Sequence, residues 1–347
     1  MLAGSRSGAS TPLEGVDALL ADLDGVVYAG PAALPHAIES LNAAGIDRAL
    51  GYITNNASRT DVSVAAHLSE LGLTVRADDV VTSPQAAVRL LATMVAPGAT
   101  VLVVGGEGLV VELEKAGFVV TRSAGDAPAA VVQGFAPEVN WKQLAEAAFA
   151  LKTPIDEGGI PWIATNNDWT MPQARGIAPG NGTLVSAVHT AVGRLATVAG
   201  KPETPIFEVA VARFGAASPL FLGDRLDTDI LGANRAGMPS ALVLTGIDRP
   251  KQVLGADPFS RPTYILGDLR ELHQPYPDVH SASDGTVTVG DAAVRFSGDD
   301  VTLLAAGDRP IDVVRAGTRA IWDSGRAIYG LNIDERDLYA QSLAASD

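Results

Sequence analysis

The sequence predicts an α/β protein built on a parallel sheet. Short apolar runs typical of buried strands alternate with longer segments in which apolar residues recur at helical spacing, beginning with a helix over 34–44 and a strand over 49–54. This alternation indicates a parallel sheet covered by helices on both faces. Several runs end abruptly in acidic or amide side chains, and ligands of open α/β sheets bind beyond the carboxyl ends of the strands. The fold class therefore also predicts where a site lies.

The expected elements follow one another along most of the chain. The first strand ends just before Asp22, and the later strands are expected at 49–54, 101–105, 129–133, 162–165, 220–223 and 240–244. The helices are expected at 34–44, 60–71, 85–94, 108–116, 141–151, 205–214 and 230–236. Near the end, apolar and polar residues alternate around Gly290-Asp291, which predicts a β-hairpin within 285–296, followed by a helix over 311–324.

A chain of 347 residues is too long for one compact core and suggests two or three domains. The loop at 96–98 precedes a fresh series of strands and helices, and the prolines of 275–277 separate the body from a tail. We expect a core formed by 13–83 and 191–274, an inserted α/β domain at 84–190 and a small C-terminal α+β appendage at 278–347.

Composition excludes several functional classes. The chain has no cysteine, which rules out disulfides and thiolate chemistry. A formal net charge of −15 argues against a nucleic-acid partner, because nucleic-acid binding needs clustered lysine and arginine. No apolar run approaches the roughly 18 to 20 residues that span a bilayer, and residues 1–12 lack the apolar region of a signal peptide. We expect a cytoplasmic protein without a membrane partner.

The most informative run ends the first strand with two carboxylates, Asp22 and Asp24. Ionised groups are costly to bury unless they are paired or bind a cation, so this pair indicates a metal site, a nucleophile or both. The alternative is a turn in which Asp24-Gly25 only reverses the chain.

Three further segments resemble the first in placing polar groups at the ends of elements. Thr54-Asn55-Asn56 closes the second strand with a hydroxyl, two amides and their backbone donors, which suits a phosphate. Lys201 supplies a single cation before a predicted helix. The strand at 220–223 leads into Asp224 and, five residues later, Asp229.

These four motifs, in this order, resemble those of the haloacid dehalogenase (HAD) superfamily. The similarity covers residues 13–272 and is to the class IIA phosphatases, which carry a large C2-type cap inserted between the second and third motifs. It implies a HAD-like Rossmannoid core, a cap formed by the inserted segment and hydrolysis of phosphate monoesters. It does not extend to the appendage, for which packing, dimerisation or regulation remain open.

The resemblance also implies a role for each acid. Asp22 would attack phosphorus to give an aspartyl phosphate, while Asp24 would protonate the leaving group and later deprotonate the attacking water. Mg²⁺ would be held by the Asp22 carboxylate, the backbone carbonyl of Asp24 and the Asp224 side chain, since this cation prefers oxygen ligands. Asp229 would lie outside these ligands and steady a metal-bound water or Lys201.

The remaining motifs would bind the substrate. Thr54 and the backbone that follows it, including Asn55 and Asn56, would hold phosphoryl oxygens, and Lys201 would offset the charge shared by the nucleophile and the phosphoryl group. In the cap, Asp168 and Arg175 are candidates for contacting the leaving group, with stabilisation of the cap itself as the alternative.

A large cap with polar residues that could enclose a compact leaving group, together with a single site lysine, predicts a small phosphorylated metabolite as the partner. The similarity extends to actinobacterial glycerol-phosphate phosphatases, and the arginine-rich, lysine-poor composition agrees with such a source. Glycerol 3-phosphate is therefore the first expectation. The alternatives are 2-phosphoglycolate, pyridoxal phosphate and nucleoside monophosphates. Self-association into a homo-oligomer is left open.

Two functions of other kinds compete with a phosphatase. The first is a catalytically idle HAD-like sensor that acts through its tail, but Asp24 is intact and its loss would be the simplest route to inactivity. The second is a phosphoryl-transferring mutase, which normally carries a smaller cap near the first motif. The short spacing between Asp24 and Thr54 leaves little room for that insert.

Overall fold

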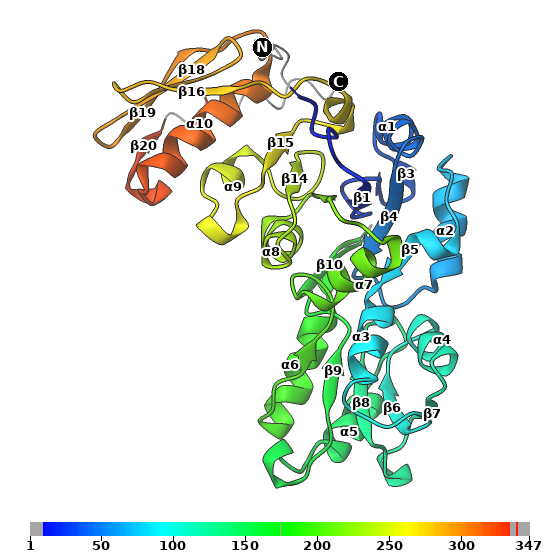
Figure 1. Cartoon of the computed structure of the whole chain (residues 1–347). Helices are drawn as coiled ribbons and strands as arrows, with labels where there is room; N and C mark the ends of the chain where they lie inside the picture. Colours follow the sequence, from blue (N-terminus) through cyan, green and yellow to red (C-terminus); the bar gives the residue numbers. More distant parts are fainter. Residues whose placement is uncertain (1–9, 174, 334–337, 339–347) are drawn as a thin grey trace, which may run out of the picture. The chain divides into compact units, whose positions relative to one another are not determined.

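The computed structural model of the chain describes residues 10–173, 175–333 and 338 (Figure 1). These residues form two compact units. Unit 1 takes the described residues of 1–29, 33–48 and 218–347, and unit 2 takes those of 30–32 and 49–217. The division into core, cap and appendage at the boundaries given above stays a prediction, as does any structure in the undescribed end of the tail. Among the described helices, none is long and apolar enough to cross a membrane.

Unit 1 contains four parallel strands whose residues are almost entirely buried. Their order is β15-β14-β13-β1, and the strands span Tyr264–Leu266, Ser240–Val243, Pro219–Gly223 and Ala18–Ala21. Every residue of β1 and β14 is buried, which explains their nearly continuous apolar sequence, because a parallel sheet is covered on both faces. The predicted α/β class with a parallel-sheet core is confirmed.

Three helices among the described residues of unit 1 are short. They are α1 (Ala37–Ala44), α8 (Leu231–Arg235) and α9 (Pro250–Leu254), and two-residue strands β2 (Tyr28–Ala29) and β3 (Ala32–Ala33) precede α1 in the chain. The helix expected at 230–236 is entered through a π-helical turn, Leu226–Ile230. Such turns are rare and are enriched at functional sites.

Unit 2 begins with the parallel pair β4 (Ala49–Thr54) and β5 (Val80–Thr82). Helix α2 (Asp61–Glu70) starts where the Thr60 hydroxyl accepts the Ser63 backbone N–H at 3.2 Å, and α3 (Ser83–Leu91) follows β5 directly. Helix α7 (Pro205–Phe214) carries proline in its first turn, where no intrahelical donor is lost. The strand β5 was not anticipated.

A second parallel sheet lies within unit 2, in the order β12-β9-β8-β6-β7. Its strands are Thr197–Val198, Trp162–Ala164, Ala130–Gln133, Thr100–Val104 and Val119–Thr121. Helices α5 (Trp141–Ala150) and α6 (Asn181–Val192) pack on one face in a shared apolar cluster, and α4 (Glu107–Lys115) follows β6. An unanticipated hairpin, β10 (Thr170–Gln173) and β11 (Gly176–Pro179), precedes α6.

The tail forms a five-stranded sheet and one long helix within unit 1. The strands β16 (Val279–Ser281), β17 (Thr286–Val289), β18 (Ala292–Ser297), β19 (Asp300–Ala305) and β20 (Asn332–Ile333) lie in sequence order. The predicted hairpin is confirmed as β17 and β18, and Gly290 between them adopts φ +54°. Helix α10 (Pro310–Ser324) confirms the predicted helix and packs on this sheet (Figure 1).

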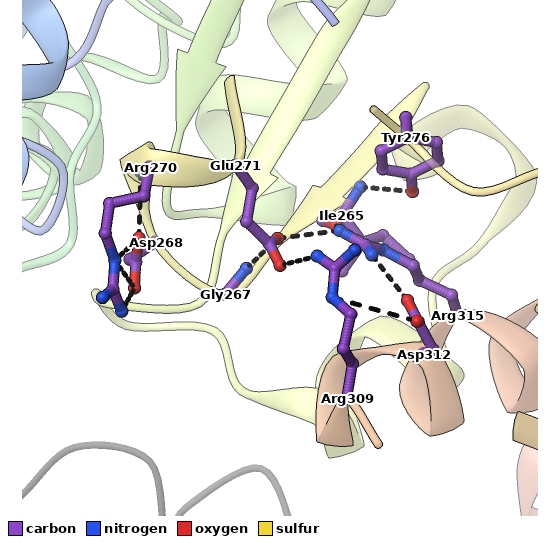
Figure 2. A network of polar contacts seen from close by, with 9 residues as sticks. All are labelled: Ile265, Gly267, Asp268, Arg270, Glu271, Tyr276, Arg309, Asp312 and Arg315. Atoms are coloured by element: carbon purple, nitrogen blue, oxygen red, sulfur yellow. Dashed lines mark hydrogen bonds and ion pairs between the residues drawn. The ribbon is translucent and has the colours of Figure 1, made fainter. Parts of the chain in front are cut away.

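A buried polar network fastens α10 to the parallel strands of unit 1 (Figure 2). The Arg315 side chain, 2% exposed, lies 2.7 Å from carboxylate oxygens of both Asp312 and Glu271. It also donates to the backbone carbonyl of Ile265 in β15, at 2.7 and 2.9 Å. Its guanidinium carbon stands 4.4 Å from the centre of the Tyr276 ring, and burial raises the pKa of that phenol. The tail is therefore an integral part of unit 1.

This network predicts an unequal effect of two arginine substitutions on α10. Arg315→Met removes the buried cation that Asp312 and Glu271 share and leaves them only the partly exposed Arg309, at 2.5 Å from Glu271 and 4.0 Å from Asp312, so the free energy of unfolding should fall by about 3 kcal/mol. Arg319→Met is the matched control, because its ion pair with Asp323 is exposed and such pairs contribute less than about 1 kcal/mol. Urea unfolding followed by circular dichroism measures both. Equal losses in the two variants would contradict the assignment.

Candidate active site

Two of the predicted acids follow neighbouring strands of the unit 1 sheet. Strands β1 and β13 pair in parallel, with Ala21 opposite Leu222. The Asp22 backbone N–H continues this ladder by donating to the carbonyl of Leu222 at 2.9 Å. Asp224 comes one residue after the end of β13. The register of a single strand pair therefore brings both carboxylates to the same edge of the sheet.

A third carboxylate joins them. Asp22, Asp224 and Asp229 each contribute an oxygen to a cluster in which these atoms lie within 4.8 Å of one another. The three residues are 8%, 1% and 1% exposed. Like charges at this distance repel by roughly 3 kcal/mol per pair at an effective dielectric constant of about 20. Oxygen ligands in a buried, negatively charged cluster suit a hard divalent cation.

Backbone donors hold the Asp229 carboxylate in place. One of its oxygens accepts the backbone N–H groups of Asp224 and Arg225, both at 3.1 Å. The π-helical turn carries this side chain back under the end of β13, so close that a Cβ at Gly223 would stand 2.2 Å from the Asp229 Cβ. Asp227, in contrast, is exposed and pairs with Arg225 at 2.8 Å.

Asp24 lies in the tight turn that follows β1 and is exposed. Gly25 adopts φ +83°, a conformation that favours glycine, and its N–H donates to the carbonyl of Tyr28 at 2.8 Å. The Thr245 hydroxyl donates to the Gly25 carbonyl at 2.7 Å. The turn predicted as the alternative to a functional site is thus present, and it brings Gly25 so close to the carboxylate cluster that an added Cβ would stand 2.2 Å from Asp224 Oδ2.

The loop after β14 was missed by sequence reasoning, although it contacts Asp224 directly. The Ile247 backbone N–H donates to Asp224 Oδ2 at 2.6 Å, and the Asp248 N–H donates to the Asp224 carbonyl at 3.1 Å. Burial raises the pKa of the Asp248 carboxyl, against the lowering effect of the Leu226 N–H that it accepts at 2.6 Å. The signal available in the sequence was Thr245-Gly246 directly after a buried strand.

The other predicted site residues belong to unit 2. Thr54 ends β4 and is 4% exposed, and its hydroxyl accepts the backbone N–H of Asn56 at 3.1 Å. The Asn56 side chain accepts the Ser58 N–H at 2.8 Å. Two consecutive side-chain caps therefore shape this loop, in the manner of Asx and related turns.

Asn55 connects this loop to Lys201 and Asp168. Its side-chain oxygen accepts the backbone N–H of Lys201 at 2.9 Å, and its amide nitrogen donates to the Lys201 carbonyl at 3.1 Å. The same nitrogen lies 3.1 and 3.3 Å from the two carboxylate oxygens of Asp168. Lys201 itself is 4% exposed. The structure thus brings three of the predicted residues together.

Arg175 is placed differently. It lies in the turn of the β10–β11 hairpin and is exposed, and none of the polar contacts among the described residues involves it. A contact between Arg175 and a leaving group therefore stays a prediction, and the structure adds no partner that favours it. Trp169, at the base of the same hairpin, is 60% exposed.

Two family profiles match the chain. Residues 19–119 match the haloacid dehalogenase-like hydrolase profile, and residues 198–272 match a HAD-hydrolase-like profile. A D-glycerol 3-phosphate phosphatase of Mycobacterium tuberculosis is 45% identical over 314 residues, which cover 90% of this chain and 87% of the relative. The chain belongs to the haloacid dehalogenase-like hydrolases. A glycerol-3-phosphate phosphatase of Gallus gallus is 38% identical, over 70% of this chain and 84% of its own length.

Solved structures of this family share the fold. A glycerol phosphate phosphatase of Mycobacterium tuberculosis in complex with magnesium is 42% identical with a TM-score of 0.83, over 94% of this chain and 95% of that one. A p-nitrophenyl phosphatase of Archaeoglobus fulgidus is 26% identical with a TM-score of 0.67, over 74% and 98%. The predicted membership of the HAD class IIA phosphatases is confirmed.

The loop after β14 leads to a prediction about cation binding. A Cβ at Gly246 would stand 1.9 Å from Asp224 Oδ2, so Gly246→Ala forces the carboxylate to move. We expect the half-saturating Mg²⁺ concentration to rise at least about tenfold, which corresponds to about 1.4 kcal/mol. Isothermal titration calorimetry measures it. Gly330→Ala is the matched control, since nothing lies within 4 Å of its added Cβ. Unchanged Mg²⁺ affinity in Gly246→Ala would show that the loop does not set the carboxylate position.

Proposed function

We propose that the protein is a Mg²⁺-dependent phosphatase that hydrolyses small phosphate monoesters through an aspartyl phosphate on Asp22, with glycerol 3-phosphate as its preferred substrate. The observation that carries the proposal is the buried cluster of Asp22, Asp224 and Asp229 beyond the ends of β1 and β13. The substrate is supported by the named activities of the relatives from Mycobacterium tuberculosis and Gallus gallus.

The donor set fits magnesium. The cluster offers carboxylate oxygens alone, in an electrostatic environment that disfavours three bare negative charges. Asp22 and Asp224 would hold the ion together with the backbone carbonyl of Asp24. Asp229, one oxygen of which already accepts two backbone N–H groups, would orient what surrounds the ion. When bound, the ion would neutralise charge on the transferring phosphoryl group.

The chemistry requires two acids with different tasks. A carboxylate oxygen of Asp22 would form a bond to phosphorus as the ester bond to the leaving oxygen breaks, and the Asp24 carboxyl would give that oxygen its proton. In the second half, Asp24 would take a proton from water as the water attacks phosphorus and releases Asp22 with inorganic phosphate. Their environments suit this division, because Asp22 is buried and Asp24 is exposed to solvent.

The residues of unit 2 would bind the substrate. Thr54 and the backbone donors of Asn55 and Asn56 would hold phosphoryl oxygens, and the buried Lys201 would offset their charge. Asp168 and Arg175 would contact the leaving group.

Several broader expectations complete the proposal. The partner would be a small phosphorylated metabolite rather than nucleic acid, as the net charge of −15 suggests. We place the protein in the cytoplasm, where an ionised phosphate ester is retained because charge is costly to move into lipid. A homo-oligomer would be compatible with the same site.

The covalent mechanism predicts that Asp22→Asn abolishes turnover. An amide is a poor nucleophile and a weak magnesium ligand, so kcat should fall by about 10⁴ or more, as it does when a nucleophile is removed from other covalent catalysts. The fold should survive this isosteric change. Asp17→Asn at the other end of β1 is the matched control, because an amide oxygen still accepts the Ser218 N–H. Steady-state rates decide, and an active Asp22→Asn protein would exclude the covalent step.

A panel of phosphate monoesters tests the function itself. Initial rates with Mg²⁺ should give a larger kcat/KM for glycerol 3-phosphate than for 2-phosphoglycolate, pyridoxal phosphate or a nucleoside monophosphate. EDTA should stop turnover and added Mg²⁺ should restore it, because the carboxylate cluster then lacks its cation. A kcat/KM at least about tenfold higher for one of the other esters, or about 1.4 kcal/mol of barrier, would replace the substrate and leave the phosphatase in place. No turnover of any ester would refute the function.

A further inference from the structure

We infer that Asn55 is a positioning residue of the phosphatase, which fixes the backbone of Lys201 and couples it to Asp168. This inference rests on the proposed function and gives the Asn55 side chain a role of its own beside that of its backbone donor. Asp168 also acts as a positioning residue, because its carboxylate is a hydrogen-bond acceptor for Asn55. All the contacts involved lie within unit 2.

The side-chain amide of Asn55 forms hydrogen bonds with both backbone groups of Lys201, as a peptide group of a neighbouring chain segment would. Its oxygen accepts the Lys201 N–H at 2.9 Å, while its nitrogen donates to the Lys201 carbonyl at 3.1 Å. The nitrogen has a second hydrogen, and that one faces the Asp168 carboxylate at 3.1 and 3.3 Å. All of these amide hydrogens and the oxygen are therefore used within the protein, which leaves the side chain no donor for a substrate.

The packing around Lys201 depends on this close approach. A Cβ at the preceding residue, Gly200, would stand 2.6 Å from Asn55 Oδ1 and 2.4 Å from the carbonyl of Thr165. The glycine therefore allows the Lys201 backbone to reach the amide.

Two further side chains hold Asn55 itself. Its backbone carbonyl accepts the Ser83 hydroxyl at 2.7 Å and the Asn166 side-chain amide at 2.8 Å. Ser83 begins α3, and Asn166 follows β9, so the residue is fixed from separate elements. The Asn166 carbonyl in turn accepts the Asn181 amide at 2.8 Å, at the start of α6. A chain of amides thus runs from α6 to Lys201.

Asp168 connects this arrangement to the β10–β11 hairpin. It precedes β10 by two residues, and the Gly182 N–H donates to its carbonyl at 2.9 Å. Its own N–H donates to the Asn166 side chain at 3.2 Å. A shift of the residues at the base of the hairpin would therefore displace Asn55 and the Lys201 backbone.

The test moves the negative charge from position 168 to position 55. Asn55→Asp places a carboxylate against the Lys201 carbonyl and Asp168, so we expect kcat/KM for glycerol 3-phosphate to fall about 100-fold, the scale of a small misplacement of a catalytic group. Adding Asp168→Asn places a side-chain amide donor next to the carboxylate at position 55. This double variant should recover at least about tenfold of the lost kcat/KM. Asn55→Ala, which introduces no charge, should lose activity without any rescue by Asp168→Asn.

Two readouts separate positioning from general damage. The inhibition constant of inorganic phosphate should rise about tenfold in Asn55→Asp, because Lys201 is misplaced, whereas the Mg²⁺ concentration for half-maximal activity should stay within about twofold. Asn140→Asp is the matched control. Asn140 caps α5 through its oxygen, which an aspartate retains, and should leave every parameter unchanged.

The outcomes distinguish this inference from the proposed function. Wild-type kcat/KM in Asn55→Asp, or the absence of rescue in the double variant, would overturn the positioning role while the phosphatase stands. If the wild-type protein turns over no ester, calorimetric binding of inorganic phosphate with Mg²⁺ still compares wild type with Asn55→Asp. Equal phosphate affinity, or no binding by the wild type, would then refute the inference as well.

Discussion

The crowding of three buried carboxylates is the constraint on which the site of unit 1 depends. Asp22, Asp224 and Asp229 would repel one another strongly in the absence of compensation, yet the sheet holds them within 4.8 Å. Backbone donors supply part of the compensation, from Asp224, Arg225 and Ile247. In the proposed function, a divalent cation would supply the rest. The parallel register of β1 and β13 places Asp22 and Asp224 close enough together to need it.

In unit 2, hydrogen bonds also hold a candidate site residue in place. There the side-chain amide of Asn55, rather than a backbone amide, binds the backbone N–H and carbonyl of Lys201. An amide can do this because it carries both a donor and an acceptor and no charge of its own. Loops that carry catalytic residues lack the regular hydrogen bonding of helices and strands, so side chains such as Asn55 and Thr54 must replace it.

Sequence reasoning predicted the members of the carboxylate cluster that directly follow buried strands. Asp22 and Asp224 were predictable because an ionised group directly after an apolar run is costly to bury unless it is paired or binds a cation. The contact of Ile247 with Asp224 was not, since it uses a backbone N–H and any residue has one. The pairing of Asn55 with Lys201 was missed for a related reason, because it joins residues 146 positions apart. Short strands such as β5 and the β10–β11 hairpin also escaped, since three or four residues carry little periodicity.

The network around Arg315 has a consequence for self-association. Strand β15 is the outermost strand of its sheet, and such strands tend to pair with other chains through their unused backbone groups. Here the Ile265 N–H is bound by the Tyr276 hydroxyl at 3.0 Å, and its carbonyl accepts two hydrogen bonds from Arg315. Tyr276 and the Arg315 side chain of the tail therefore close this edge to intermolecular strand addition. A second copy of the chain would have to bind through some other surface.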